Sequence, residues 1–167
     1  MRAILAYADR LALRGHEVSV VVPAKSRLRA LWLAWRGEGP TWVPGFSARV
    51  RWVDEWRVAD VGDADVVVAT AWQSAAVAAA APVSAKYYLV QHYESLYHGN
   101  AETVDATYRL PLQKIVVSTW LRDIMRERFA SEAEVIVTPV DPVLFHPVDV
   151  DVAQRSEERR VGKECRL

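Results

Sequence analysis

Short runs typical of strands alternate with segments of helical periodicity, and this alternation constrains the fold more than any other feature. The runs lie at residues 18–22, 49–53, 66–69, 87–90, 115–117 and 134–137. Apolar residues recur at helical spacing between them, within 2–14, 26–36, 73–81, 104–110 and 118–129. Parallel strands joined by helical crossovers are the economical solution to this pattern. The sequence therefore predicts an α/β chain with an open, doubly wound, Rossmann-like sheet.

The flanking residues refine these elements. Gly15 follows the first expected helix, at the position where helices commonly end with a residue in the left-handed conformation. Pro23 ends the first expected strand. The unbroken apolar run at 18–22 predicts a strand buried on both faces, whereas the alternation at 49–53 predicts a half-buried or edge strand.

Composition narrows the class of protein. The chain has 167 residues, 51% of them hydrophobic, which suits one ordinary domain. Its 21 basic and 21 acidic residues give no net charge, so we expect no binding to nucleic acid. The single Cys165 cannot form an internal disulfide. No apolar run reaches the roughly 18 residues of a membrane span, and no secretory leader is present, which favours the cytoplasm.

Tryptophan is concentrated in one stretch. Of the 7 Trp residues, the following lie close together in sequence: Trp32, Trp35, Trp42, Trp52 and Trp56. Aromatic side chains bury large apolar areas without any ligand, so we expect packing between the strand at 49–53 and nearby helices. A ligand platform is the alternative.

Ligands of a doubly wound sheet bind beyond the carboxyl ends of its strands, so the residues that follow the strands are the candidates for ligand binding. The strand at 87–90 delivers Gln91, His92 and Glu94 to that edge, and Thr70 and Ser118 follow two other strands. An imidazole at this place can exchange protons or donate to a phosphate or carbonyl oxygen, and a carboxylate can orient it or bind a sugar hydroxyl. The alternative is that His92 bonds only a loop carbonyl.

Other chemistries find less support. His92, Glu94 and His98 do not match a compact zinc pattern, so no metal is expected. The acidic pairs at 63–65 and 149–151 are interpreted as solvated turns. The helix start at 70–72 offers backbone N–H groups to an anion, but every crossover does so. Walker, GxGxxG and GxSxG motifs are absent from the sequence.

Four segments, taken in order, resemble the N-terminal half of a retaining, family 4 glycosyltransferase of the GT-B fold. They are RAILAYADRLALRGHEVSVVVP, ADVVVATAWQSA, KYYLVQHYESLYH, and IVVSTWLRDIMRERF with VIVTPVDPVLFHPVD. Pro139 stands where the last pattern often has glycine.

The resemblance implies a hexosyltransferase-like parent enzyme without metal or cofactor, active in polysaccharide or glycolipid synthesis. Its substrates are a nucleotide sugar and a glycan or glycolipid acceptor, and the parent makes peripheral membrane contact. It places His92 beside the transferred sugar as the catalytic residue, with Gln91 and Glu94 binding substrate by motif. Thr70 and Ser118 are carried over as cleft-edge positions. The C-terminal domain, which holds most of the donor, is missing.

The same resemblance implies that residues 1–150 form a GT-B half-domain that is truncated at both ends and lacks its first strand. That strand would lie between the runs at 18–22 and 66–69, so we expect an open gap there, poor stability and no transferase activity. Residues 151–167 are interpreted as a non-native or disordered tail, because RSEERRVGKECR resembles a translated sequencing adapter. A non-catalytic sugar- or nucleotide-binding module is the alternative function. A nicotinamide-dependent oxidoreductase is disfavoured because the strand at 18–22 continues into Pro23-Ala24-Lys25, without an acidic residue.

Overall fold

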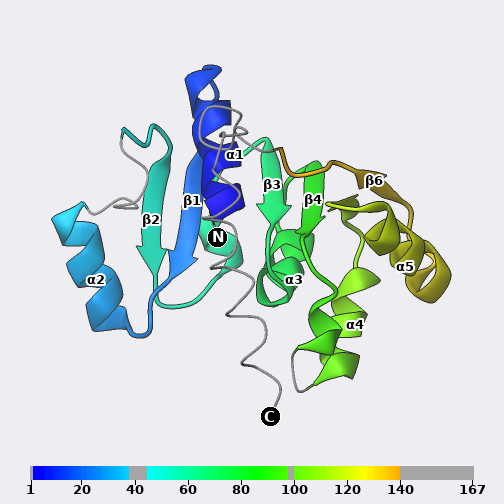
Figure 1. Ribbon diagram of the computed structural model, residues 1–167. Helices are drawn as coiled ribbons and strands as arrows, with labels where there is room; N and C mark the ends of the chain where they lie inside the picture. The colour runs from blue at the N-terminus through cyan, green and yellow to red at the C-terminus, as the bar shows by residue number, and fades with distance from the viewer. Residues whose placement is uncertain (1, 38–44, 98–99, 140–167) are drawn as a thin grey trace, which may run out of the picture.

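The computed structural model describes residues 2–37, 45–97 and 100–139, which form alternating helices and parallel strands (Figure 1). The strands are β1 (Ser19–Pro23), β2 (Arg49–Val53), β3 (Val66–Ala69), β4 (Ala85–Val90), β5 (Gln113–Val116) and β6 (Ala133–Val135). The α-helices are α1 (Arg2–Leu13), α2 (Arg27–Arg36), α3 (Trp72–Ala80), α4 (Ala101–Tyr108) and α5 (Thr119–Phe129). Two single 3₁₀ turns are η1 (Val58–Asp60) and η2 (Glu94–Leu96). The α/β prediction is confirmed.

The described strands form two parallel sheets rather than one. β1 pairs with β2, and the second sheet has the order β3-β4-β5-β6. In each sheet the strands follow their order along the chain, from β1 to β2 in one sheet and from β3 to β6 in the other. The two sheets extend in opposite directions, as the two halves of a doubly wound Rossmann-like sheet do. In the view of Figure 1, β1 and β3 stand apart with α1 between them, and within the described residues no hydrogen-bonded ladder joins the two strands. Among the described strands, β1 therefore pairs only with β2, and β3 only with β4.

Local sequence explains where the helices begin and end. The Ser26 hydroxyl accepts a hydrogen bond from the Arg29 backbone N–H (3.3 Å) and starts α2. Gly37 ends α2 with a left-handed φ of 62°. Asn100 caps α4 through Thr103 N–H (3.0 Å), so this helix begins earlier than the apolar pattern at 104–110 predicted.

The principal core lies between the four-stranded sheet and helices α3, α4 and α5. It is built from small residues of α3, one stripe of α5 and several aromatic rings. Its most deeply buried large side chains are Tyr88, Tyr108, Leu121, Met125, Val104 and Val116. Close packing of α3 on β3 and β4 is possible because this helix presents Ala75 and Ala78. The core therefore holds the carboxyl ends of β3, β4 and β5 in a fixed arrangement.

Two sequence expectations need correction. β1 is not buried on both faces: Val20, Val21 and Val22 are only half-buried, because one edge of the strand has no described neighbour. The expected packing holds for Trp52 of β2, which is half-buried and lines one groove with Ala30 and Ala34 of α2. Trp56 is also half-buried, and its Nε1–H donates to the Val21 carbonyl (3.1 Å).

The packing expectation is wrong for two tryptophans of α2. The exposed fractions are 47% for Trp32 and 83% for Trp35. Trp42 lies outside the described residues, as do the proposed tail, the acidic pair at 149–151 and the end of the expected first domain.

Candidate functional site

The carboxyl ends of three adjacent strands carry the predicted site residues. Thr70 follows β3, Gln91 follows β4, and Ser118 lies two residues after β5. The register pairs Ala69 with Tyr88 and Val90 with Val116, so the three positions share one edge of the sheet. Ser118 also serves as the N-cap of α5, since its hydroxyl accepts from the Leu121 N–H (3.3 Å). Its backbone position is thereby fixed by the helix.

Glu94 closes this edge by reaching to the start of α3. Its Oε2 atom accepts a hydrogen bond from the Trp72 N–H (2.9 Å). The Ser74 hydroxyl accepts from the N–H groups of Thr70 and Ala71, both at 3.3 Å. The first residue of α3 thus already binds a carboxylate of the chain itself, and the N–H groups of the two residues before the helix are bound by Ser74.

Aromatic side chains fix the loop that carries Glu94. The Glu94 N–H donates to the Tyr108 hydroxyl (3.0 Å), and the ring of Tyr108 stacks on Tyr88 with centroids 5.8 Å apart. Burial raises the pKa of Tyr108 to about 12 and also raises the pKa of Tyr88. Both phenols are therefore neutral near pH 7, and Tyr108 acts as a hydrogen-bond acceptor for the loop.

A second set of polar contacts ties the same loop to α4 and α5. The Tyr93 hydroxyl donates to Asp105 Oδ1 (3.1 Å) and accepts from the Arg128 guanidinium (2.8 Å). The Ser95 hydroxyl donates to the same Asp105 oxygen. Arg128 also lies 5.5 Å above the Tyr93 ring, a cation–π distance. The segment from Tyr93 to Ser95 is consequently held at three points.

His92 lies on this rigid loop with its side chain exposed, and Gln91 before it is half-buried. Within the described residues neither side chain has a hydrogen-bond partner, so the proposed contact of His92 with a loop carbonyl is not seen there. Glu94 points to α3 rather than to His92, and His98 lies outside the described residues. The arrangement offers one imidazole, one amide and two hydroxyls at a preformed sheet edge.

Sequence reasoning missed the residues that support this edge. Tyr88, Tyr93, Tyr108 and Phe129 form one aromatic cluster, with Tyr108 and Phe129 centroids 5.0 Å apart. The sequence did not reveal that these rings support the loop, because Tyr108 and Phe129 lie on helices distant from it in sequence. The pattern of aromatic residues at 87, 88 and 93 was the available signal.

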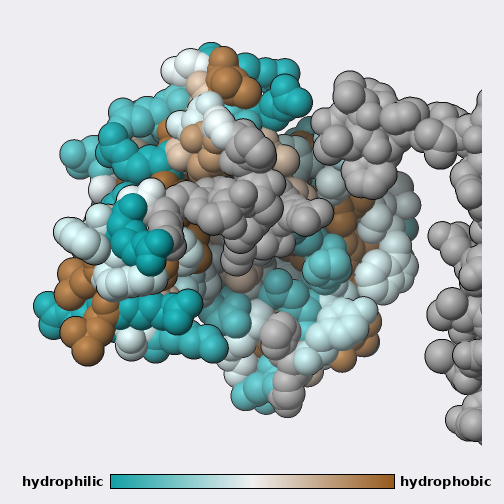
Figure 2. All heavy atoms as spheres, turned by 60° about the vertical axis from the view of Figure 1, so that its left-hand side comes forward, coloured by the Kyte–Doolittle hydropathy of each residue, from teal (hydrophilic) through white to brown (hydrophobic). Residues whose placement is uncertain are grey.

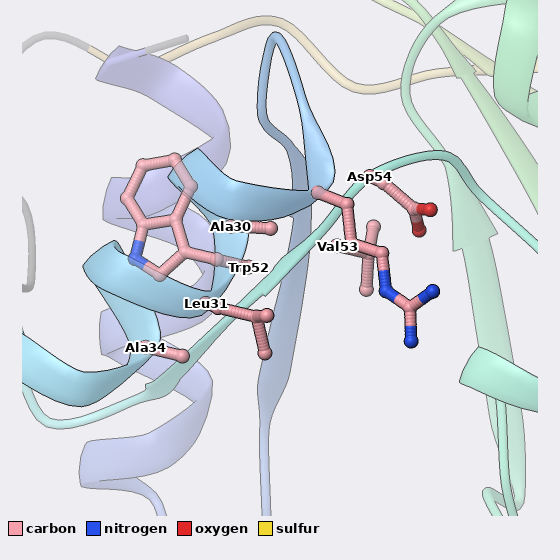
Figure 3. Close-up of a pocket in the computed structure, with 7 residues that line it drawn as sticks. Ala30, Leu31, Ala34, Trp52, Val53 and Asp54 are labelled. Carbon is pink, nitrogen blue, oxygen red and sulfur yellow. The ribbon is translucent and has the colours of Figure 1, made fainter.

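A shallow groove lies elsewhere, between α2 and β2, with a volume of about 190 Å³. Figure 3 shows Ala30, Leu31 and Ala34 of α2 facing Trp52 and Val53 of β2, with Asp54 at the end of the strand. It is open and mostly apolar, and it is lined by none of the sheet-edge residues described above.

Family models, curated proteins and solved structures gave no match to the chain.

Proposed function

We propose that the chain is the acceptor-side domain of a retaining glycosyltransferase of the GT-B type. In this proposal the enzyme transfers a sugar, with retention of configuration, from a nucleotide-sugar donor to a glycan or glycolipid, without metal. The donor half belongs to a second α/β domain, and the cytoplasm is the compartment. His92 is the catalytic residue that orients or stabilises the reacting groups, while Thr70, Gln91 and Ser118 contact the acceptor.

The observation that carries the proposal is the occupation of the α3 N-terminus by Glu94. A phosphate binds readily at a helix N-terminus with free N–H groups. The Trp72 N–H, the first of α3, is already bound by Glu94, and the N–H groups of Thr70 and Ala71 just before the helix are bound by Ser74. The Glu94 carboxylate would repel a nucleotide phosphate at this place, whereas it can accept a hydrogen bond from a neutral sugar hydroxyl. The chemistry of this edge thus suits an acceptor better than a nucleotide.

Binding to the present chain tests the assignment directly. We would titrate the ¹⁵N-labelled protein with short alkyl glycosides below their micelle concentration, and separately with UDP and GDP. We expect saturable shifts at Thr70, Gln91, His92 and Ser118 with at least one glycoside and none with the nucleotides. Saturable shifts with a nucleotide alone would favour a nucleotide-binding module instead. No shift with any glycoside would reject the acceptor role.

The catalytic role of His92 is tested in the two-domain enzyme that the proposal requires. A general acid–base or charge-stabilising contact contributes about 10²- to 10⁴-fold to rate. We expect His92→Ala to lower kcat by at least about 100-fold with little change in donor KM. Unchanged kcat would remove His92 from the mechanism. We expect no transfer by the present chain alone, and measurable turnover would reject that expectation.

A further inference from the structure

Strand β2 has one edge that no described strand covers. The Arg49 N–H donates to the Val18 carbonyl (2.8 Å), and the Val53 carbonyl accepts from the Ala24 N–H (2.7 Å), so both ends of β2 bond to β1. Alternate residues of a strand direct their backbone groups to opposite sides, so the N–H and C=O of Val50 point away from β1. Within the described residues no strand lies on that side. Such an edge is a template for a further strand.

An apolar groove lies between this strand and α2. Figure 3 shows Leu31 and Ala34 of α2 turned toward Trp52 of β2 across the groove. Its volume of about 190 Å³ is below the roughly 300–1,000 Å³ of pockets that enclose a small molecule, so it suits an apolar side chain. Leu31 remains 60% exposed there, so the groove offers apolar surface that the described residues leave uncovered. Like the other described helices, α2 is not long and apolar enough to cross a membrane.

Basic side chains border the groove. Arg27 lines it, and Lys25 and Arg29 are exposed beside Arg27 in sequence. Within the described residues the guanidinium groups of Arg27 and Arg29 have no ion-pair partner. The carboxylate that lines the groove, Asp54, is bound by the two terminal nitrogens of Arg57 at 3.0 and 3.1 Å. The uncompensated charge at the groove is therefore positive. Figure 2 brings this side of the molecule forward, where brown apolar side chains lie beside teal hydrophilic ones.

The face of β2 that carries Arg49 and Arg51 is also basic. Both arginines are exposed, and they share one face because successive side chains of a strand alternate. Arg49 lies 4.0 Å from Glu17 and Arg51 lies 3.8 Å from Asp60, which are long ion pairs of surface residues. Pairing of β2 along its length with a second copy would bring the arginines of the two copies close together. The edge thus favours an acidic strand over a copy of itself.

We propose that the β2 edge and the α2 groove bind an extended, acidic peptide segment of a partner protein. The segment adds a strand to β2 through backbone hydrogen bonds that include those of Val50. Its side chains alternate, so its apolar residues enter the groove while its acidic residues face Arg49 and Arg51. Binding does not depend on the proposed transferase function, because no residue of the candidate site lines the groove.

Synthetic heptapeptides test the proposal on the full chain. Glutamate occupies the odd positions and valine, leucine or phenylalanine the even ones, and in matched peptides lysine replaces glutamate. We expect fluorescence anisotropy to give at least one glutamate peptide a Kd of about 10⁻⁴ M or lower, at least about tenfold below that of its lysine counterpart. Failure of every glutamate peptide to bind at about 1 mM, or equal binding of the lysine peptides, would overturn the proposal.

N-methylated peptides separate strand addition from simple attraction between charges. Methylation of alternate amides removes the hydrogen-bond donors on one edge of the peptide and leaves its charge unchanged. We expect methylation of one edge to weaken binding at least about tenfold and methylation of the other edge to have little effect. The bound peptide should also slow the exchange of the Val50 N–H with solvent. Equal effects of the two methylation patterns would show that no strand is added.

Paired variants locate the contact. Leu31→Glu, within the groove, should weaken binding of the glutamate peptides at least about tenfold. Leu28→Glu makes the same change on the same helix, at a side chain that is 81% exposed outside the groove, and should weaken binding much less. Equal effects of these two variants would reject the groove as the site. Circular dichroism would verify that both keep the fold, as we expect for exposed positions.

Reversal of charge tests the strand. Arg49→Glu should weaken binding of the glutamate peptides and strengthen binding of the lysine peptides, whereas Arg14→Glu, at an exposed position after α1, should do neither. The same response in both variants would reject β2 as the strand that is extended. A second copy of the chain as the occupant would instead give a concentration-dependent dimer in sedimentation without peptide. Such a dimer, dissociated by Leu31→Glu and not by the peptides, would also overturn the proposal.

Discussion

The carboxylate of Glu94 accepts a hydrogen bond from the backbone N–H of Trp72 at 2.9 Å, across 22 residues of sequence. This contact connects the loop after β4 to the first turn of α3. It satisfies one N–H group that the helix leaves unpaired, and it sets a negative charge at the positive end of the helix dipole. One side chain thereby stabilises a helix and determines which ligands its N-terminus can accept.

Removing Glu94 should lower stability and open an anion site. Loss of a helix cap costs about 1 kcal/mol, so we expect Glu94→Ala to reduce the free energy of unfolding in urea by about that amount. We expect sulfate to recover part of the loss, because the Trp72 N–H becomes available to an anion. The control is Glu102→Ala, an exposed residue in the first turn of α4. Sulfate and chloride are compared at matched ionic strength. If sulfate stabilises the wild type and Glu94→Ala equally, the Glu94 carboxylate does not prevent an anion from binding at the Trp72 N–H.

Tyr108 should make the protein sensitive to alkali. Its pKa is about 12 in the folded chain and 10.0 ordinarily, so the folded state retains a proton that the unfolded state releases between these values. Stability should therefore fall as pH rises through that window, by about 1.4 kcal/mol per pH unit for one proton, and not below it. We expect Tyr108→Phe to flatten this part of the curve, leaving the part due to Tyr88.

The same substitution should cost about 1 kcal/mol at pH 7, because the Glu94 N–H loses its acceptor. Urea unfolding at several pH values measures both effects. Tyr97→Phe is the control, since its side chain is 77% exposed. An unchanged alkaline slope in Tyr108→Phe would contradict the assignment.

Ala130 ends α5 in a left-handed conformation, with a φ of 51°. This backbone region is strained for residues with a Cβ atom, by about 1 kcal/mol, and glycine adopts it freely. We expect Ala130→Gly to raise the melting temperature. Ala106→Gly, at an exposed position inside α4, should lower it by a comparable amount, since glycine destabilises a helix interior. The opposite signs separate cap strain from the general effect of glycine, and a loss of stability in both variants would contradict the cap argument.

The elements that sequence predicted well are those set by local signals. Gly15 follows α1 with the expected left-handed φ of 92°, and α2 and α5 begin at the predicted bounds, with Ser26 and Ser118 as their N-caps. Thr70, Gln91 and Ser118 also lie on one sheet edge, as their places after the strands predicted. The sequence could not predict which residues hold this edge in place. The contacts of Glu94 with Trp72 and of its N–H with Tyr108 form only after α3 and α4 have packed. The outward direction of Trp35 was missed because apolar periodicity identifies a helix face but not whether protein covers it.

The open edges of β1 and β3 should control how the chain behaves in solution. Val66 and Val68 are 51% and 46% exposed on a strand whose second edge has no described neighbour. Such an edge is a template for pairing with other chains, and each unpaired backbone group that becomes buried costs about 1–3 kcal/mol. We expect the wild-type chain to aggregate when it is held at 37 °C, whereas at lower temperature it stays folded and soluble.

Charge at this strand should suppress the association. We expect Val66→Lys with Val68→Lys to slow aggregation at 37 °C, followed by light scattering, with little loss of helical circular dichroism, because both side chains are directed largely into solvent. Val67→Lys is the matched control: Val67 packs against the core, so the same charge there should unfold the chain and speed aggregation. A monomeric wild type with a sharp, reversible thermal transition would show that the open edges carry no such liability.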